Sequence, residues 1–171
     1  MILRIKKADV QDIPKMCITL MSMKESADCI TESEMHDFID RTYYAEDEND
    51  NILAIITANR RSIEYSEEAT RQNLNSTRYQ IKHLLFSKQA IEEAGYDCTK
   101  VVKRLVKELC ADLNDWSVWI DIEYQAGINL GASKEDTISI ITESVLANGF
   151  KQAINRFAYI RVMPIDFGKL H

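Results

Sequence analysis

Hydrophobic and polar positions along the chain predict strands and helices that are mixed over its whole length. A period of two is typical of strands, and apolar residues three and four apart are typical of helices. On this basis strands are predicted over 2–7, 42–47, 51–59, 79–86, 117–124, 150–155 and 157–163. Helices are predicted over about 9–24, 31–41, 97–109 and 134–148.

Capping residues and a glycine mark where several of these helices begin and end. Asp9 and Thr31 are candidate N-caps, and Glu34, three residues after Thr31, completes a capping-box pattern. Asn148 followed by Gly149 is typical of a helix end at which the glycine adopts a left-handed conformation. The inward face of this late helix is expected to carry Ile138, Ile141, Val145 and Leu146.

The middle of the chain is expected to form the centre of a sheet. The acidic, turn-rich residues 48–51 separate two predicted strands, which indicates a hairpin. Residues 52–56 are apolar on both faces, so the second strand of that hairpin should be central. In the next strand, simple alternation places four side chains on one face, namely Tyr79, Ile81, His83 and Leu85.

Length and composition fit one folded domain. The chain has 171 residues, of which 46% are hydrophobic and 28% charged, as in ordinary globular proteins. We therefore expect a single domain over 1–171, with a polar insertion at about 60–75. A formal net charge of -6 argues against a nucleic-acid partner, because phosphates require clustered Lys and Arg. No apolar run reaches the length of a signal peptide or a membrane span, so we expect a cytoplasmic protein that does not bind membranes.

The four cysteines, Cys17, Cys29, Cys98 and Cys110, lie far apart and form no C-x-x-C pair. In a reducing compartment this spacing indicates free thiols, so we expect neither a disulfide framework nor a metal site.

Three stretches, in this order, resemble the GNAT-type N-acetyltransferase superfamily. The stretch YYAEDENDNILAII resembles the acidic hairpin before that family's central strand, although Ala54 stands where glycine is usual. KHLLFS, followed by a loop and TKVVKRLVKEL, resembles the family's cofactor strand, loop and helix. ITESVLANGFKQA resembles its late helix, Gly-Phe turn and next strand. The resemblance implies an α/β (α+β) fold with a mixed central sheet of about seven strands and helices on both faces.

The resemblance also implies a place for acetyl-CoA or another acyl-CoA as co-substrate. The pantetheine arm would lie along Leu84, Leu85 and Phe86. The diphosphate would lie against a helix N-terminus, where free N–H groups and a partial positive charge favour anions. The residues at that place are Gly95, Tyr96, Asp97, Cys98 and Thr99.

The loop departs from the family's pattern of Arg or Gln, two residues, Gly, one residue, Gly or Ala. It has one glycine and no arginine, and Glu92, Glu93 and Asp97 would bring negative charge near a diphosphate. The alternative interpretation is that Asp97 and Thr99 only cap a helix.

The catalytic positions also depart from the family, which often has a tyrosine four residues before the glycine of the Gly-Phe turn. Val145 stands there, so Glu123 and Tyr124, at the end of a predicted strand, are the nearest candidates for base and acid. The alternative interpretation is that they are an exposed strand-end carboxylate and a half-buried aromatic. His83 is expected to pack within the fold, and a helix N-terminus could lower the pKa of Cys98.

Three functions remain open from the sequence. The first is an acetyl-CoA-dependent N-acetyltransferase that acts on an amine of a small molecule or peptide. The second is a catalytically inactive binding or regulatory protein with the same fold, and the third is a generic α/β interaction domain. The sequence leaves a homodimer open, and it does not identify the acceptor, because fold does not fix function.

Overall fold

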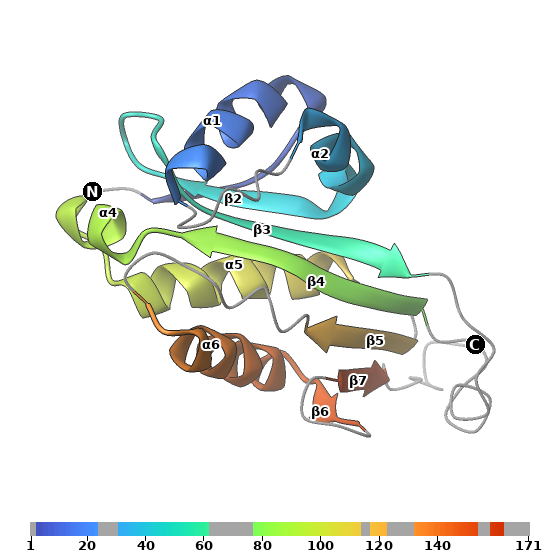
Figure 1. Cartoon of the computed structure of the whole chain (residues 1–171). Coiled ribbons are helices and arrows are strands. Elements are labelled where there is room, and N and C mark those ends of the chain that lie inside the picture. Colours follow the sequence, from blue (N-terminus) through green and yellow to red (C-terminus); the bar gives the residue numbers. More distant parts are fainter. Residues whose placement is uncertain are drawn as a thin grey trace, which may run out of the picture.

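A computed structural model describes residues 3–23, 31–61, 77–113, 117–122, 132–153 and 158–162. These residues form one twisted sheet with helices on both of its faces (Figure 1).

The sheet has seven strands in the order β1-β2-β3-β4-β5-β7-β6. The strands are β1 (Arg4–Lys7), β2 (Thr42–Glu46), β3 (Ile52–Arg61), β4 (Thr77–Phe86), β5 (Ser117–Ile122), β6 (Lys151–Gln152) and β7 (Ala158–Val162). Only the β4–β5 pair is parallel; the other five neighbouring pairs are antiparallel. The predicted mixed sheet of about seven strands is thus confirmed.

The helices lie close to their predicted positions, with one addition. They are η1 (Val10–Asp12), α1 (Ile13–Met23), α2 (Glu32–Phe38), η2 (Ile39–Arg41), α4 (Lys88–Glu93), α5 (Cys98–Asp112) and α6 (Lys134–Ala147). Asp9 and Thr31 are N-caps, as predicted: each side chain accepts a hydrogen bond from a backbone N–H of the first turn. Helix α4 was expected to be loop, because its six residues are too few to show a helical period.

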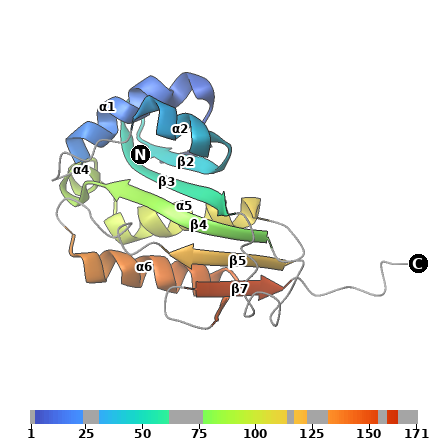
Figure 2. The ribbon, with the colours of Figure 1, turned by 45° about the vertical axis from the view of Figure 1, so that its right-hand side comes forward.

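The two faces of the sheet carry separate apolar cores. On one face α5 and α6 pack on the sheet through residues such as Val102, Leu105 and Ile141. On the other face α1 and α2 pack through Met16 and Met35. Figure 2 shows α1 and α2 together over β2 and β3, with α5 on the opposite side of the sheet.

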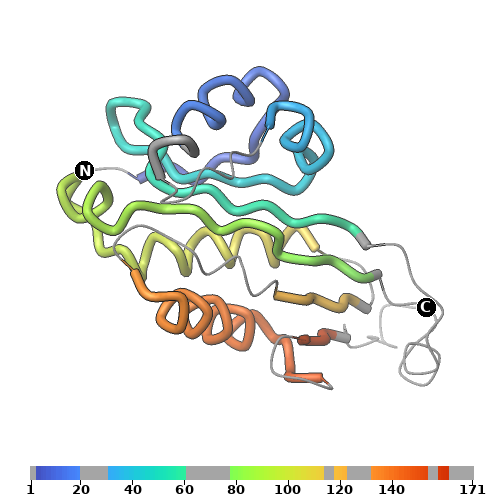
Figure 3. Tube along the Cα trace, in the orientation of Figure 1, coloured from blue at the N-terminus to red at the C-terminus, as the bar shows by residue number. Residues whose placement is uncertain are grey.

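The parallel pair at the centre is the topological feature that matters most for a site. The register runs from Thr77 opposite Val118 to Ile81 opposite Ile122. The chain passes from β4 through α4 and α5 to reach β5, and the tube in Figure 3 shows the two strands side by side. Because the strands predicted over 79–86 and 117–124 are joined through a helix, the sequence predicts that they form a parallel pair, and the register confirms it.

The predicted alternation along β4 is wrong in its second half. Thr57 of β3 pairs with His83, but the next residue, Ala58, pairs with Ile81, so Lys82 is an extra residue. This β-bulge reverses the face on which the following side chains lie. Ile81 packs on the α5 side, whereas Leu85 belongs to the core under α1 and α2. The ring of His83 lies against Phe38 of α2, on that same side.

The end of α6 follows the prediction, but its buried face does not. Gly149 has a φ of 88°, as predicted, and Phe150 returns to the core. Leu146, predicted to be inward, is 46% exposed, and Ile138 is only half-buried. Thr137 and Ser144 are buried in their place. Their hydroxyl groups can be buried because each donates a hydrogen bond to a backbone carbonyl one turn earlier.

Two sequence predictions concern residues beyond those described. Residues 62–76, most of the predicted insertion, are outside the described residues, whereas Arg60 and Arg61 belong to β3. Residues 154–157, where the strand predicted over 150–155 ends and the one over 157–163 begins, are also outside them.

Candidate active site at the carboxyl end of β4

A pocket of about 320 Å³ opens where β4 ends. It lies on the α5 and α6 side of the sheet, because residues from both helices form its walls. The lining residues are Phe86, Lys88, Cys98, Thr99, Ala132, Ser133, Asp136, Ser139 and Ile140.

The N-termini of two long helices meet at this pocket. Asp97 caps α5 by accepting a hydrogen bond from the N–H of Lys100 at 3.0 Å. Ser133 caps α6 in the same way, through the N–H of Asp136 at 3.1 Å. The first N–H groups of a helix have no partner inside it, so those of Cys98 and Thr99 are available to a ligand. Two helix dipoles therefore direct their positive ends at one pocket.

Lys88 adds a full positive charge to the pocket, and Asp136 adds a negative one. Helix α4 places Lys88 there, because Ser87 caps the helix directly after β4 and accepts a hydrogen bond from the N–H of Ala90. Lys88 was not among the site residues predicted from the sequence. It is the single basic residue between Phe86 and Lys100, and this was a signal that could have identified it.

The three strand residues proposed for the pantetheine arm are buried and face different ways. Phe86 lines the pocket, Leu84 belongs to the core under α5, and Leu85 belongs to the core under α1 and α2. Within the described residues, the pairing of β4 with β5 ends at Ile81. β4 continues beside β3 to Phe86, whereas the described part of β5 ends at Ile122, opposite Ile81.

The five loop residues proposed for the diphosphate are only partly brought together. Cys98 and Thr99 line the pocket. Gly95, with a φ of 88°, makes the turn between α4 and α5. Tyr96 lies near the β2–β3 turn, where burial and the carboxylates of Glu48 and Asp47 raise its pKa. Asp97 is the helix cap, which confirms the capping alternative for that residue.

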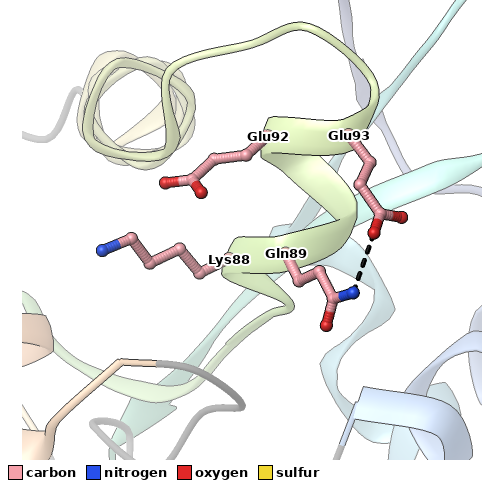
Figure 4. Close-up of a pocket in the computed structure, with 4 residues that line it drawn as sticks. All are labelled: Lys88, Gln89, Glu92 and Glu93. Atoms are coloured by element: carbon pink, nitrogen blue, oxygen red, sulfur yellow. Dashed lines mark hydrogen bonds between the residues drawn. The ribbon is translucent and has the colours of Figure 1, made fainter.

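The three acidic residues near the loop differ in their surroundings. Glu93 accepts a hydrogen bond from Gln89 at 2.8 Å, and Figure 4 shows both on a different side of α4 from Lys88 and Glu92. These four residues also line a shallow hollow of about 410 Å³ on the surface of α4. Glu92 and Asp97 both act electrostatically on Cys98, a pocket residue. Two of the three carboxylates therefore lie near the pocket.

Cys98 is not poised as a nucleophile. Burial raises the pKa of its thiol to about 11, and the carboxylates of Glu92 and Asp97 add to the increase. The positive charge of Lys88 lowers this pKa, but by less than burial raises it. The pKa lowering considered from the sequence is thus wrong, because loss of hydration outweighs the helix N-terminus at this position.

The structure does not test the residues predicted to transfer protons. Glu123 and Tyr124 lie outside the described residues. Val145 is fully buried in the core, so it supplies packing where the family often has a tyrosine. The sequence-based roles of Glu123 and Tyr124 remain predictions.

Two other classes of site find no support in the described ranges. No three His, Cys, Asp or Glu side chains in that part of the chain gather as metal ligands would. Among its helices, none has the length and apolar character needed to cross a lipid bilayer.

Comparison with known proteins yields a likeness of structure alone. No family profile and no curated protein sequence matches the chain. A GNAT-family acetyltransferase from Staphylococcus aureus Mu50 is 12% identical, with 94% of this chain and 99% of that chain covered and a TM-score of 0.52. Arylalkylamine N-acetyltransferase 2 from Aedes aegypti is 10% identical, with coverages of 94% and 98% and a TM-score of 0.56. A polyamine N-acetyltransferase from Drosophila melanogaster, which forms N-acetylagmatine, is 9% identical, with coverages of 95% and 100% and a TM-score of 0.53.

These three proteins match nearly the full length of the chain, and the seven-stranded sheet with helices on both faces fits the architecture that the sequence resemblance implied. The chain therefore has the fold of the GNAT-superfamily N-acetyltransferases.

Proposed function

We propose that the protein is an acyl-CoA-dependent N-acyltransferase that transfers an acetyl group to an amine of a small molecule or peptide. The observation that carries this proposal is the pocket at the end of β4. There the N-termini of α5 and α6 meet beside Lys88.

The pocket suits the diphosphate of acyl-CoA. The N–H groups of Cys98 and Thr99 and the ammonium group of Lys88 are the donors that would hold it. The pantetheine arm would run from Phe86 along β4 toward Lys82. Its amides would bond there to backbone groups of the strand.

The reaction forms a C–N bond and breaks the C–S bond of the thioester. The acceptor amine loses a proton before or during its attack, and the departing thiolate of CoA gains one. Glu123 and Tyr124 follow directly in the sequence after Ile122, the last described residue of β5 and the partner of Ile81 in β4. We infer from this position that they are candidates for the base and the acid. The proposal places the reaction in the cytoplasm, as the sequence pattern predicts.

Three features favour the second candidate, a catalytically inactive acyl-CoA-binding protein. Glu92 and Asp97 lie near the pocket, and Val145 replaces the tyrosine that the family often uses. Negative charge near a diphosphate weakens binding, and the loss of an acid slows release of the thiolate.

A transfer assay separates the two candidates. Purified protein would be incubated with acetyl-CoA and one of three acceptors: agmatine, an arylalkylamine such as tryptamine, or a lysine-containing peptide. Release of free thiol would be followed spectroscopically and the new amide by mass spectrometry. The proposal predicts amide formation with at least one acceptor, in step with thiol release. Saturable acetyl-CoA binding without any amide would contradict it and support the inactive binding protein.

A further inference from the structure

A band of basic side chains lies along the exposed surface of α5 and has no part in the site described so far. Its members are three and four residues apart and share one side of the helix, namely Lys100, Lys103, Arg104 and Lys107. All four are exposed, in a chain whose formal net charge is -6. The band begins in the first turn of α5, next to the pocket that Thr99 lines. Positive charge at this place can attract a further anionic group of the ligand.

Lys103 is the member of this band that faces α6. Helices α5 and α6 pack against each other, and both begin at the pocket (Figure 1). Lys103 lies one helical turn beyond Thr99 on α5, and Glu143 lies one turn beyond Ser139 on α6; Thr99 and Ser139 both line the pocket. Residues so spaced have Cβ atoms roughly 6 Å apart. Nζ of Lys103 is 3.6 Å from Oε2 of Glu143, so this pair lies between the two helices, one turn from the pocket.

The other basic residues of the band are less well placed. The guanidinium of Arg104 donates to the backbone carbonyl of Leu3 at 3.5 Å, which directs it toward the start of β1. Lys107 lies a full turn further from the pocket than Lys103. Helical spacing places Lys100 between the directions of Lys103 and Arg104. Lys103 is therefore the member that best combines nearness to the pocket with orientation toward α6.

The ion pair of Lys103 with Glu143 is easily exchanged for another anion. The two side chains are 47% and 63% exposed, and their separation of 3.6 Å is too long for a hydrogen bond. Such a pair contributes little to stability, because water screens both charges. A phosphate monoester carries up to two negative charges and three acceptor oxygens, and it forms shorter, stronger bonds with an ammonium group. Lys103 can therefore turn to a phosphate at small cost.

We propose that Lys103 binds the 3′-phosphate of acyl-CoA, so that the protein selects CoA thioesters over thioester donors that lack this phosphate. The inference rests on the proposed function, which places the diphosphate against the N–H groups of Cys98 and Thr99. One ribose carries both the diphosphate and the 3′-phosphate, so the second group must lie close to the first. A lysine one helical turn from Thr99, on the side of α6, lies within reach of it. Glu143 would then be left beside the phosphate and would weaken its binding.

Calorimetric titration with acetyl-CoA and with acetyl-3′-dephospho-CoA tests the assignment. The wild type should bind acetyl-CoA roughly tenfold more tightly than the dephosphorylated ligand. Lys103→Met should bind the two ligands with equal affinity, because only the contact to the 3′-phosphate is lost. Glu143→Gln should gain roughly twofold to fivefold in affinity for acetyl-CoA and nothing for the other ligand. Lys107→Met, the matched control on the same helix, should keep the wild-type ratio.

The phosphorus signal of the 3′-phosphate gives a second readout, which needs no acceptor amine. An ammonium group nearby favours the dianion and so lowers the second pKa of a phosphate monoester, ordinarily about 6. In ³¹P spectra of bound acetyl-CoA, recorded from about pH 5 to 8, this pKa should lie below that of the free ligand. Lys103→Met should return it to the value of the free ligand, whereas Lys107→Met should leave it lowered.

The outcomes separate this inference from the proposed function. If the wild type binds both ligands with equal affinity and the pKa of the phosphate is unchanged, the inference is wrong and the proposed function stands. The inference is also wrong if Lys100→Met, and not Lys103→Met, abolishes the preference for acetyl-CoA. If the wild type binds neither ligand at millimolar concentration, both the proposed function and the inference fail.

Discussion

Two neighbouring glutamates on α4 allow a residue-scale test of the pocket's electrostatics. Glu92 acts on Cys98 in the pocket, whereas Glu93 is bonded to Gln89 on another side of the helix. Glu92→Gln should therefore tighten acetyl-CoA binding roughly two- to fivefold, since an exposed charge contributes modestly. The gain should shrink as salt is raised. Calorimetry on both variants is the measurement, and an equal gain for Glu93→Gln would contradict this placement of the diphosphate.

The thiol of Cys98 gives a second residue-scale prediction. Because burial raises its pKa to about 11, the thiolate fraction should still increase about tenfold per pH unit between pH 8 and 10. The alkylation rate of Cys98 by iodoacetamide, measured by peptide mass spectrometry, should follow that increase without levelling. A plateau below pH 9 would indicate an ordinary or lowered pKa and would restore Cys98 as a candidate nucleophile.

For single residues, a structural role could be predicted from the sequence only where a few neighbouring residues determine it. The cap at Asp97 and the left-handed Gly149 were predictable, because each depends on a few consecutive residues. Lys88 and the orientation of His83 were not. The position of Lys88 depends on a six-residue helix, and the orientation of His83 depends on a single extra residue in the pairing of β3 with β4.

At the scale of elements, the end of α6 depends on the backbone of Gly149. A Cβ there would lie 3.5 Å from Cδ of Arg161, an ordinary contact, so the cost of substitution comes from its φ of 88°. Gly149→Val should lower the free energy of unfolding by roughly 1–2 kcal/mol, because a β-branched residue is strained in that conformation. Gly149→Asn should cost less, since asparagine tolerates it. Urea unfolding of both variants measures the difference, and equal stabilities would refute this account of the helix end.

Arg161 of β7 joins the C-terminal ends of α5 and α6. Its guanidinium donates to the carbonyls of Asn148 at 3.3 Å and Cys110 at 3.1 Å, and also to that of Leu113. It lies over the ring of Phe150 with 4.5 Å between Cζ and the ring centroid. Arg161→Met should lower the free energy of unfolding by roughly 2 kcal/mol or more, because buried carbonyls lose their donor.

Arg161→Lys is the control for charge. Lysine keeps the positive charge but not the planar set of donors, so its loss of stability in urea should lie between those of the wild type and Arg161→Met. A loss below about 0.5 kcal/mol for Arg161→Met would show that the three carbonyls find other partners.

At the scale of the whole molecule, the order of elements was predictable and the site was not. The period-two and helical patterns, with the resemblance, gave a mixed sheet containing a parallel β4–β5 pair. The pocket, by contrast, forms only because the first turns of α5 and α6 lie close together. No local sequence pattern predicts how near two helices far apart in the chain will lie. Helical spacing likewise predicted that Leu146 faces inward, but α6 packs so that this side chain is exposed.

The central claim is that acyl-CoA binds where these two helices begin, and calorimetric titration with acetyl-CoA tests it most directly. Lys88→Met removes the pocket's cation, whereas Lys107→Met removes an exposed lysine further along α5. The account predicts saturable binding to the wild type, affinity roughly tenfold lower in Lys88→Met, and unchanged affinity in Lys107→Met. Absence of binding to the wild type at millimolar acetyl-CoA, or equal affinities in all three proteins, would contradict it.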